Sequence, residues 1–159
     1  PDALARRMMA TADFVVNSPR MFAHWSKLFM AHPNQLRDWG QDMFHKAGGD
    51  PAIFYCHGYW KLGHGEMLII ETDVPECEHW NIQVDNWWME SMDYRYVPAC
   101  INAGNAVREA DGSVRIVLAA ENPGMPNWLT THGHGEGHLL LRWVRAESHP
   151  IPRVTVVRG

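Results

Sequence analysis

The turn sequence Gly48-Gly49-Asp50-Pro51 constrains this chain most, because two glycines followed by Asp-Pro continue neither a helix nor a central strand. Before it, apolar residues recur at helical spacing, whereas after it short apolar runs alternate with polar residues. We therefore expect a helical segment over residues 1–50 and a β-sandwich over residues 51–159, within a single domain. The length of 159 residues, 46% of them hydrophobic, suits one core.

Two or three helices are expected before this turn. Apolar residues at three- and four-residue spacings predict an amphipathic helix over residues 2–16. Asn17-Ser18-Pro19 then predicts a stop and a new start, with the serine as N-cap and the proline at the first helical position. The second helix is expected over residues 19–31, and a weaker pattern over residues 34–50 permits a third, short one.

Short strands are expected after the turn. They cover residues 53–61, 66–73, 80–85, 107–110, 113–120, 138–145 and 153–158. Asp111-Gly112 predicts a hairpin that joins the strand 107–110 to the strand 113–120. Residues 95–105 and 121–137 are expected to be loops. The fold class is thus α+β, mainly β: an antiparallel, jelly-roll-like β-sandwich preceded by two or three helices.

Charge and hydropathy exclude some classes of binding partner. With 14 basic and 18 acidic residues, the formal charge is -4, which argues against binding of nucleic acid or of an anionic membrane. No apolar run is long enough to span a bilayer. Three cysteines without a C-x-x-C motif favour reduced thiols and a cytoplasmic protein. We expect a small-molecule ligand, and leave open a homo-oligomer or, since the sequence starts at Pro1, an origin within a longer chain.

Aromatic and acidic side chains crowd the end of the stretch 79–94, where the strand alternation breaks after Asp85. Carboxylates and an imidazole beside desolvating tryptophans would suit proton transfer. The candidate catalytic residues are His134, Asp93, Glu90 and Tyr94. The candidate substrate-binding residues are Trp87, Trp128, Asn127, Ser91 and Gln83.

Structural roles compete with these assignments. Asp93 could instead pair with Arg95 or Arg142, while Asn127 and Ser91 could tie loops by hydrogen bonds. Three other tryptophans, Trp80, Trp88 and Trp143, are expected in the core. No organic cofactor is expected; His132 and His134, flanked by glycines, are weak candidates for a metal ion.

Three segments carry a family resemblance: WNIQVDNWWMESMDYR, ADGSVRIVLA and NPGMPNWLTTHGHGEGHLLLRW. They resemble the domain-of-unknown-function family twelve-fourteen over about residues 59–157. The resemblance implies a jelly-roll-like sandwich, often found C-terminal to a domain of family twelve-fifty-four, and it implies no reaction. Thr130 departs from the aspartate that the family usually has there. The matching positions are Trp80, Gln83, Trp88, Ser91, Asp93, Tyr94, Asn127, Trp128, His134, Gly137, Arg142 and Trp143.

Three functions remain open from the sequence. The first is a small-molecule enzyme with hydrolase- or lyase-like acid/base chemistry in a Trp-lined cleft. The second is a non-catalytic domain whose aromatic residues bind a sugar or an apolar small molecule. The third is an assembly domain whose Trp-rich face is a subunit interface.

Overall fold

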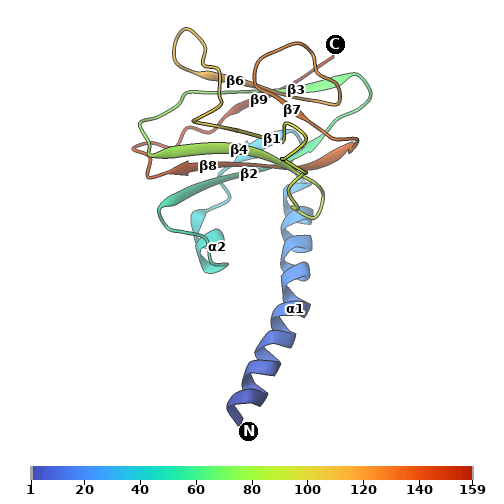
Figure 1. The fold of residues 1–159 in the computed structure, drawn as a ribbon, viewed down its shortest axis with the longest axis vertical. Coiled ribbons are helices and arrows are strands. Elements are labelled where there is room, and N and C mark those ends of the chain that lie inside the picture. Colours follow the sequence, from blue (N-terminus) through green and yellow to red (C-terminus); the bar gives the residue numbers. More distant parts are fainter. Residues whose placement is uncertain (1, 159) are drawn as a thin grey trace.

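The computed structural model describes residues 2–158 and consists of two β-sheets packed face to face, with helices below one of them (Figure 1). This confirms an α+β, mainly β protein built on a sandwich. The elements are α1 (Asp2–Phe29), β1 (Gln35–Arg37), α2 (Gln41–Lys46), β2 (Ile53–Lys61), β3 (Glu66–Thr72), β4 (His79–Asp85), β5 (Cys100–Asn102), β6 (Val114–Ala119), β7 (Trp128–Thr130), β8 (Glu136–Val144) and β9 (Arg153–Arg158).

The strands form a five-stranded sheet in the order β1-β2-β8-β4-β5 and a four-stranded sheet in the order β7-β6-β3-β9. Neighbouring strands are antiparallel except for the β6–β7 pair. β2, β3 and β4 follow one another along the chain and alternate between the sheets. β8 lies at the centre of the five-stranded sheet, so the side chains that it projects on either face are well covered.

The sandwich core takes alternate residues from these strands, as a period of two requires. Trp60, Trp80 and Trp143 are almost fully buried in it. Trp80 and Trp143 are therefore core residues, as predicted. Trp88, which was also expected in the core, is 54% exposed, because it lies in the turn after β4 rather than on the strand. That prediction is wrong.

Gly137 is required by the packing of β8 on β4. A Cβ atom at this position would overlap the carbonyl oxygen of Asp85 and lie 2.9 Å from the Trp60 ring. Two rigid neighbours leave no room to relax, so we expect Gly137→Ala to lower the free energy of unfolding by about 1–3 kcal/mol. Urea unfolding measures this; Gly135→Ala, whose Cβ would come no closer than 4.0 Å to Leu62, is the matched control. Equal stability of the two variants would contradict the packing.

Asp2–Phe29 form one continuous helix of 28 residues, α1, in place of the two helices predicted over residues 2–16 and 19–31. Pro19 lies inside it, and Ser18, the expected N-cap, donates its Oγ hydrogen back to the Phe14 carbonyl at 2.8 Å. Proline deprives the Val15 carbonyl of its helical partner. Because Val15 is exposed, water can hydrogen-bond that carbonyl, and the helix continues.

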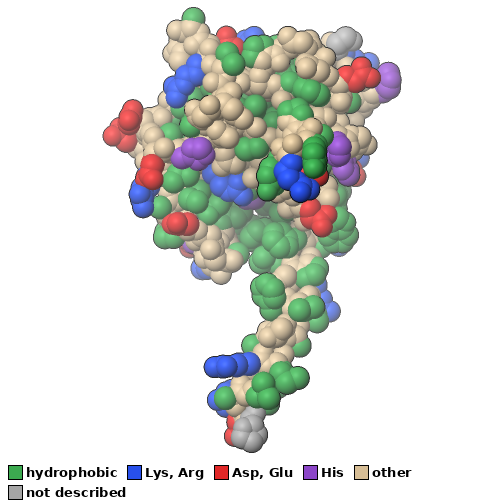
Figure 2. Space-filling model, viewed as in Figure 1, with side chains coloured by type: hydrophobic (Ala, Val, Ile, Leu, Met, Phe, Trp, Pro, Cys, Tyr) green, Lys and Arg blue, Asp and Glu red, His purple; other side chains and the backbone are tan. Residues whose placement is uncertain are grey.

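The N-terminal half of α1 extends away from the sandwich (Figures 1 and 2). Figure 2 shows hydrophobic side chains along its length, and they gather again where the helix meets the body. The exposed apolar residues of this half are Leu4, Met8, Met9, Phe14, Val15 and Val16. No helix within residues 2–158 is both long and apolar enough to cross a membrane.

The short helix predicted in residues 34–50 is present as α2, but it is preceded by the unpredicted strand β1. Gln41 then extends the sheet edge beyond β1. Its Oε1 accepts the Tyr55 backbone N–H at 2.8 Å, and its Nε2 donates to the Tyr55 carbonyl at 3.1 Å. The glutamine thus stands in for a strand partner and places α2 beside β2.

Of the predicted hairpin around Asp111-Gly112, the turn is confirmed and the first strand is wrong. The turn forms, with Gly112 at φ 87° and its N–H bonded to the Glu109 carbonyl at 3.0 Å. Residues 107–110 do not form a strand, because Asn127 binds the backbone of Val107 and β6 pairs with β3 and β7 instead. β5 and β7 lie in segments that were expected to be loops.

Candidate functional site

Three neighbouring strands place polar and aromatic side chains on the outer face of the five-stranded sheet, away from the sandwich core. Arg142 on β8 lies directly opposite Tyr55 on β2 and Asn81 on β4. Every second residue along each strand shares this face. The resulting array consists of Tyr55, His57 and Tyr59 from β2, His138, Leu140 and Arg142 from β8, and Asn81, Gln83 and Asp85 from β4.

The end of α1 and the helix α2 cover this face (Figure 1). Phe29 from α1 and Phe44 from α2 are buried together with Tyr59 in a second hydrophobic cluster. His57 stacks between the two phenylalanines, with ring centroids 5.2 and 4.6 Å away. The outer face is therefore buried around His57 and Tyr59, whereas Gln83 and Arg142 remain partly exposed.

A buried hydrogen-bonded group fixes α1 to the sheet. Ser26 Oγ donates to the Trp87 carbonyl at 2.8 Å, and His138 Nε2 lies 3.0 Å from Ser26 Oγ. Because the serine proton is engaged by the carbonyl, His138 Nε2 acts as the donor in the second bond. It cannot then take the serine proton, so this pair joins helix to sheet and is not an activated nucleophile.

A cavity of about 290 Å³ remains between the sheet face and the helical cover. Its apolar side comes mainly from the cover, through Met21, Phe22 and Trp25 of α1 and Phe44 of α2. Its polar side comes from the strands. The polar residues that line it are Tyr55, His57, Gln83, Asp85 and Arg142.

Gln83 links two charged groups in this cavity. Arg142 Nη1 donates to Gln83 Oε1 at 2.8 Å, and Gln83 Nε2 donates to Asp85 Oδ1 at 2.8 Å. Within residues 2–158 neither Arg142 nor Asp85 forms an ion pair. Each of the two side chains makes a single hydrogen bond there, the one to Gln83. The guanidinium therefore keeps most of its five N–H donors for another partner.

The pKa values define the charge of the cavity. Burial, then the charge of Arg142 and then His138, lowers the pKa of His57 to about 3, and burial lowers that of His138 to about 4. Burial raises the pKa of Asp85 to about 6, against the effects of Gln83 and Arg142. At pH 7 both imidazoles are neutral, while Asp85 and Arg142 are charged.

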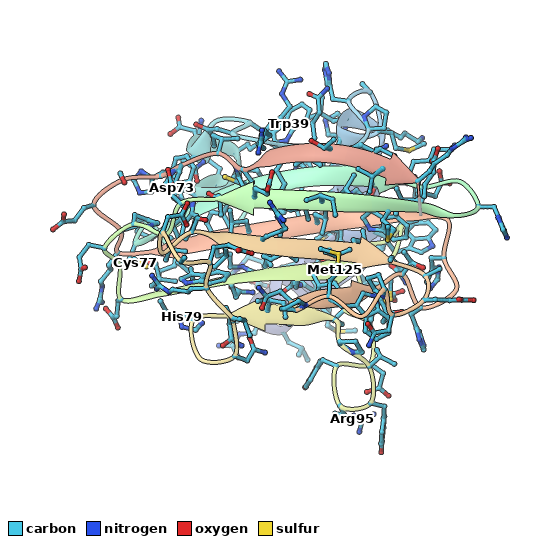
Figure 3. All side chains as sticks on the ribbon, turned by 90° about the horizontal axis from the view of Figure 1, so that it is seen from above. Trp39, Asp73, Cys77, His79, Arg95 and Met125 are labelled. Atoms are coloured by element: carbon cyan, nitrogen blue, oxygen red, sulfur yellow. The ribbon has the colours of Figure 1, made fainter. Side chains whose placement is uncertain are left out.

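The predicted catalytic residues lie elsewhere, in exposed loops. Asp93 pairs with Arg95 at 3.0 Å, the structural alternative foreseen from the sequence, and Figure 3 shows Arg95 on a loop that projects from the body. Tyr94 is 72% exposed, and Glu90 binds Asn86 at 2.7 Å. The predicted general base, His134, is exposed in the turn before β8. Within residues 2–158 no hydrogen bond or ion pair joins these four residues to one another.

Most of the predicted binding residues have structural partners. Asn127 ties the backbone of Val107 to that of Arg115, and Trp128 Nε1 donates to the Ala119 carbonyl at 3.1 Å. Ser91 is exposed, forms a single backbone bridge with Asp85, and lines a depression of about 540 Å³ together with Gln83 and Tyr94. One predicted residue does line the candidate cavity.

That residue is Gln83, whereas Trp87 packs against the second hydrophobic cluster and does not line the cavity. For the metal candidates, His132 and His134 are both exposed in the turn before β8. Over the part of the chain that the structure describes, no three His, Cys, Asp or Glu side chains gather as metal ligands.

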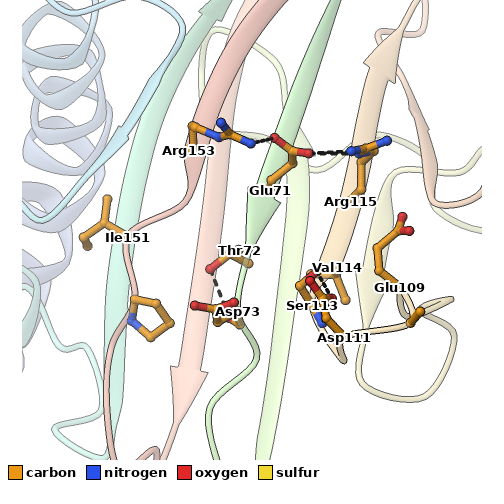
Figure 4. A pocket seen from close by; sticks show the side chains of 12 residues that line it. Glu71, Thr72, Asp73, Glu109, Asp111, Ser113, Val114, Arg115, Ile151 and Arg153 are labelled. Carbon is orange, nitrogen blue, oxygen red and sulfur yellow. Dashed lines mark hydrogen bonds and ion pairs between the residues drawn. The ribbon is translucent and has the colours of Figure 1, made fainter.

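A larger depression, of about 580 Å³, lies on the outer face of the four-stranded sheet (Figure 4). There Glu71 pairs with both Arg115 and Arg153, and Asp111 accepts hydrogen bonds from Ser113 in its own turn. The charges at its centre already satisfy one another. We therefore place the candidate site in the smaller cavity, where Asp85 and Arg142 are not paired.

Sequence reasoning missed His57, Asp85 and Arg142 as site residues. A signal was present: each occupies a polar position in a strand whose alternate positions are apolar, and Gln83 and Asp85 share one face of the strand 80–85. Which strands lie side by side could not be read from the sequence. Without that order, the polar positions of three strands could not be combined into one site.

Comparisons with known proteins support the fold. No protein-family model and no curated protein matches the chain. The crystal structure of an uncharacterised protein from Burkholderia cenocepacia is similar, with 43% identity and a TM-score of 0.84 over 86% of this chain and 38% of that one. A protein from Vibrio parahaemolyticus shares the fold alone, with 15% identity and a TM-score of 0.52 over 76% of this chain and 36% of that one.

The chain therefore spans less than half the length of these two proteins. Neither comparison supplies an activity. The fold and the site together define a β-sandwich protein with a polar cavity under a helical cover.

Proposed function

We propose that this chain binds a small organic anion in the cavity between the five-stranded sheet and the α1–α2 cover, with Arg142 as the anchor. One observation supports this above the others: the partly buried guanidinium of Arg142 lines the cavity and forms a single hydrogen bond with residues 2–158, to Gln83. A guanidinium forms paired hydrogen bonds with a carboxylate in one plane. A carboxylate is therefore the group that fits it best.

The rest of the ligand should be apolar and compact. Phe22, Trp25 and Phe44 form the opposite wall, and the volume of about 290 Å³ suits one small molecule. An aromatic carboxylate such as 3-phenylpropionate satisfies both requirements, so it is a suitable probe.

Calorimetric titration with 3-phenylpropionate tests the anchor. We expect saturable binding to the wild-type chain. Arg142→Gln should lower the affinity about 10–100-fold, because it removes a charge-assisted hydrogen bond to the carboxylate. Arg145→Gln is the matched control, because Arg145 pairs with Glu78 at the surface. The neutral amide, 3-phenylpropanamide, should bind weakly to every variant. Equal affinity of wild type and Arg142→Gln for the carboxylate would refute the proposal.

Acid/base catalysis is the second candidate, and one observation favours it. The pKa of Asp85 is raised to about 6 inside the cavity, where a carboxyl can exchange protons near neutral pH. A hydrolase- or lyase-like reaction would then use Asp85 in the place that the sequence suggested for Asp93 or Glu90. Its rate would rise as Asp85 ionises above about pH 6, if the carboxylate form is the base.

The finer assignment of the fold is also proposed. Successive strands that alternate between the two sheets support a jelly-roll-like sandwich. Membership of family twelve-fourteen stays a prediction, supported by a contact between two of its matching positions, since Arg142 hydrogen-bonds Gln83.

A further inference from the structure

Asp85 is the second charge in the cavity, and no Lys, Arg or His side chain of residues 2–158 pairs with it. The residue is 3% exposed, and Gln83 is the one hydrogen-bond partner of its side chain within residues 2–158. Arg142 acts on this carboxylate only through Gln83 and across a distance, and a buried carboxylate with no cation in direct contact is costly, so a positively charged partner would offset that cost. The cavity thus presents one unpaired anion as well as one unpaired cation.

Gln83 keeps these two charges apart while holding both in place. Its oxygen faces the guanidinium and its nitrogen faces the carboxylate, each at 2.8 Å. The other titratable groups that line the cavity are Tyr55 and His57, and His57 is neutral at pH 7. A ligand with a single charge would satisfy one end of this arrangement and leave the other end unpaired.

We infer that the ligand is a zwitterion, an amino acid with an apolar side chain, whose carboxylate binds Arg142 and whose ammonium group binds Asp85. This inference rests on the proposed function and narrows its ligand class. The side chain would lie against Trp25 and Phe44, where the cavity is apolar. The carboxylate and the ammonium group of such a ligand, both bonded to its Cα atom, would meet two charged side chains held by one amide.

Three related ligands test this inference on the wild-type chain by calorimetry. L-Phenylalanine carries both charges, 3-phenylpropionate lacks the ammonium group, and 2-phenylethylamine lacks the carboxylate. We expect phenylalanine to bind about tenfold or more tightly than 3-phenylpropionate, because it adds a charge-assisted hydrogen bond. The amine should bind most weakly.

The variant Asp85→Asn assigns the effect to one residue. It keeps the shape of the side chain and should remove the preference of the cavity for phenylalanine over 3-phenylpropionate. Circular dichroism establishes that the variant is folded. The comparison of the three ligands on the wild-type chain does not depend on this variant. If 3-phenylpropionate binds at least as tightly as phenylalanine, the zwitterion inference fails and the proposed function stands. If neither carboxylate binds at millimolar concentration, both fail.

Discussion

Lowering the pH from 7 to 4 should reduce the free energy of unfolding by on the order of 4 kcal/mol. The cause is His57 and His138, whose pKa values in the folded chain, about 3 and about 4, lie below the ordinary value of 6.5. As the pH falls below 6.5, the unfolded chain binds these protons first, and stability is lost until the folded imidazoles also titrate.

Asp85 offsets part of this loss. Its folded pKa of about 6 lies above its ordinary value of 3.8, so the folded chain binds this proton first as the pH falls. It contributes stability that is present at low pH and is lost as the pH rises through 6. Two histidines act against one carboxyl, so the net change between pH 6 and pH 4 is destabilising.

Urea unfolding at pH 7, 5.5 and 4 measures the effect. Replacing His57 by glutamine should flatten the pH dependence, whereas His64→Gln, at an exposed position, should leave it unchanged. A free energy of unfolding that stays constant or rises on acidification would show that these imidazoles are not buried in the neutral form.

Trp60→Ala should lower the free energy of unfolding by about 3–5 kcal/mol, or roughly 10 °C in melting temperature. Trp60 is fully buried between the sheets, and its indole N–H donates to the His138 carbonyl at 3.2 Å. Its removal leaves both a cavity and a carbonyl without its partner. The backbone affected belongs to β8, directly beneath the candidate site.

Trp88→Ala is the matched control for this prediction. Trp88→Ala removes the same side chain from a position that is 54% exposed, so its effect should stay within about 0.5 kcal/mol. Differential scanning calorimetry of both variants gives the comparison. Similar melting temperatures for the two would contradict the assignment of Trp60 to the core.

The sheet strands were predictable where turns and alternation agree. Two predicted strands, residues 53–61 and 153–158, match β2 and β9 in both bounds. β5 and β7 have three residues each, too few for a period of two to be visible, and their pairing depends on neighbouring strands. The break predicted at Pro19 is absent. The N-terminal half of α1 is exposed, so water can hydrogen-bond the carbonyl that the proline leaves without a helical partner.

The site was less predictable than the fold. Asp93 and His134 were predicted because carboxylate, imidazole and aromatic side chains cluster in their loops along the sequence. The structure instead unites Gln83, Asp85 and Arg142, which are separated by up to 59 residues along the chain. Their proximity follows from β4 lying beside β8, a pairing that single-strand patterns do not specify.

A crystal structure of the chain with 3-phenylpropionate tests the central claim most directly, since it shows where a carboxylate binds. We predict its carboxylate against the guanidinium of Arg142, with Gln83 still between Arg142 and Asp85, and its ring against Trp25 and Phe44. A ligand bound outside this cavity, or a cavity that excludes the carboxylate at saturating concentration, would contradict it.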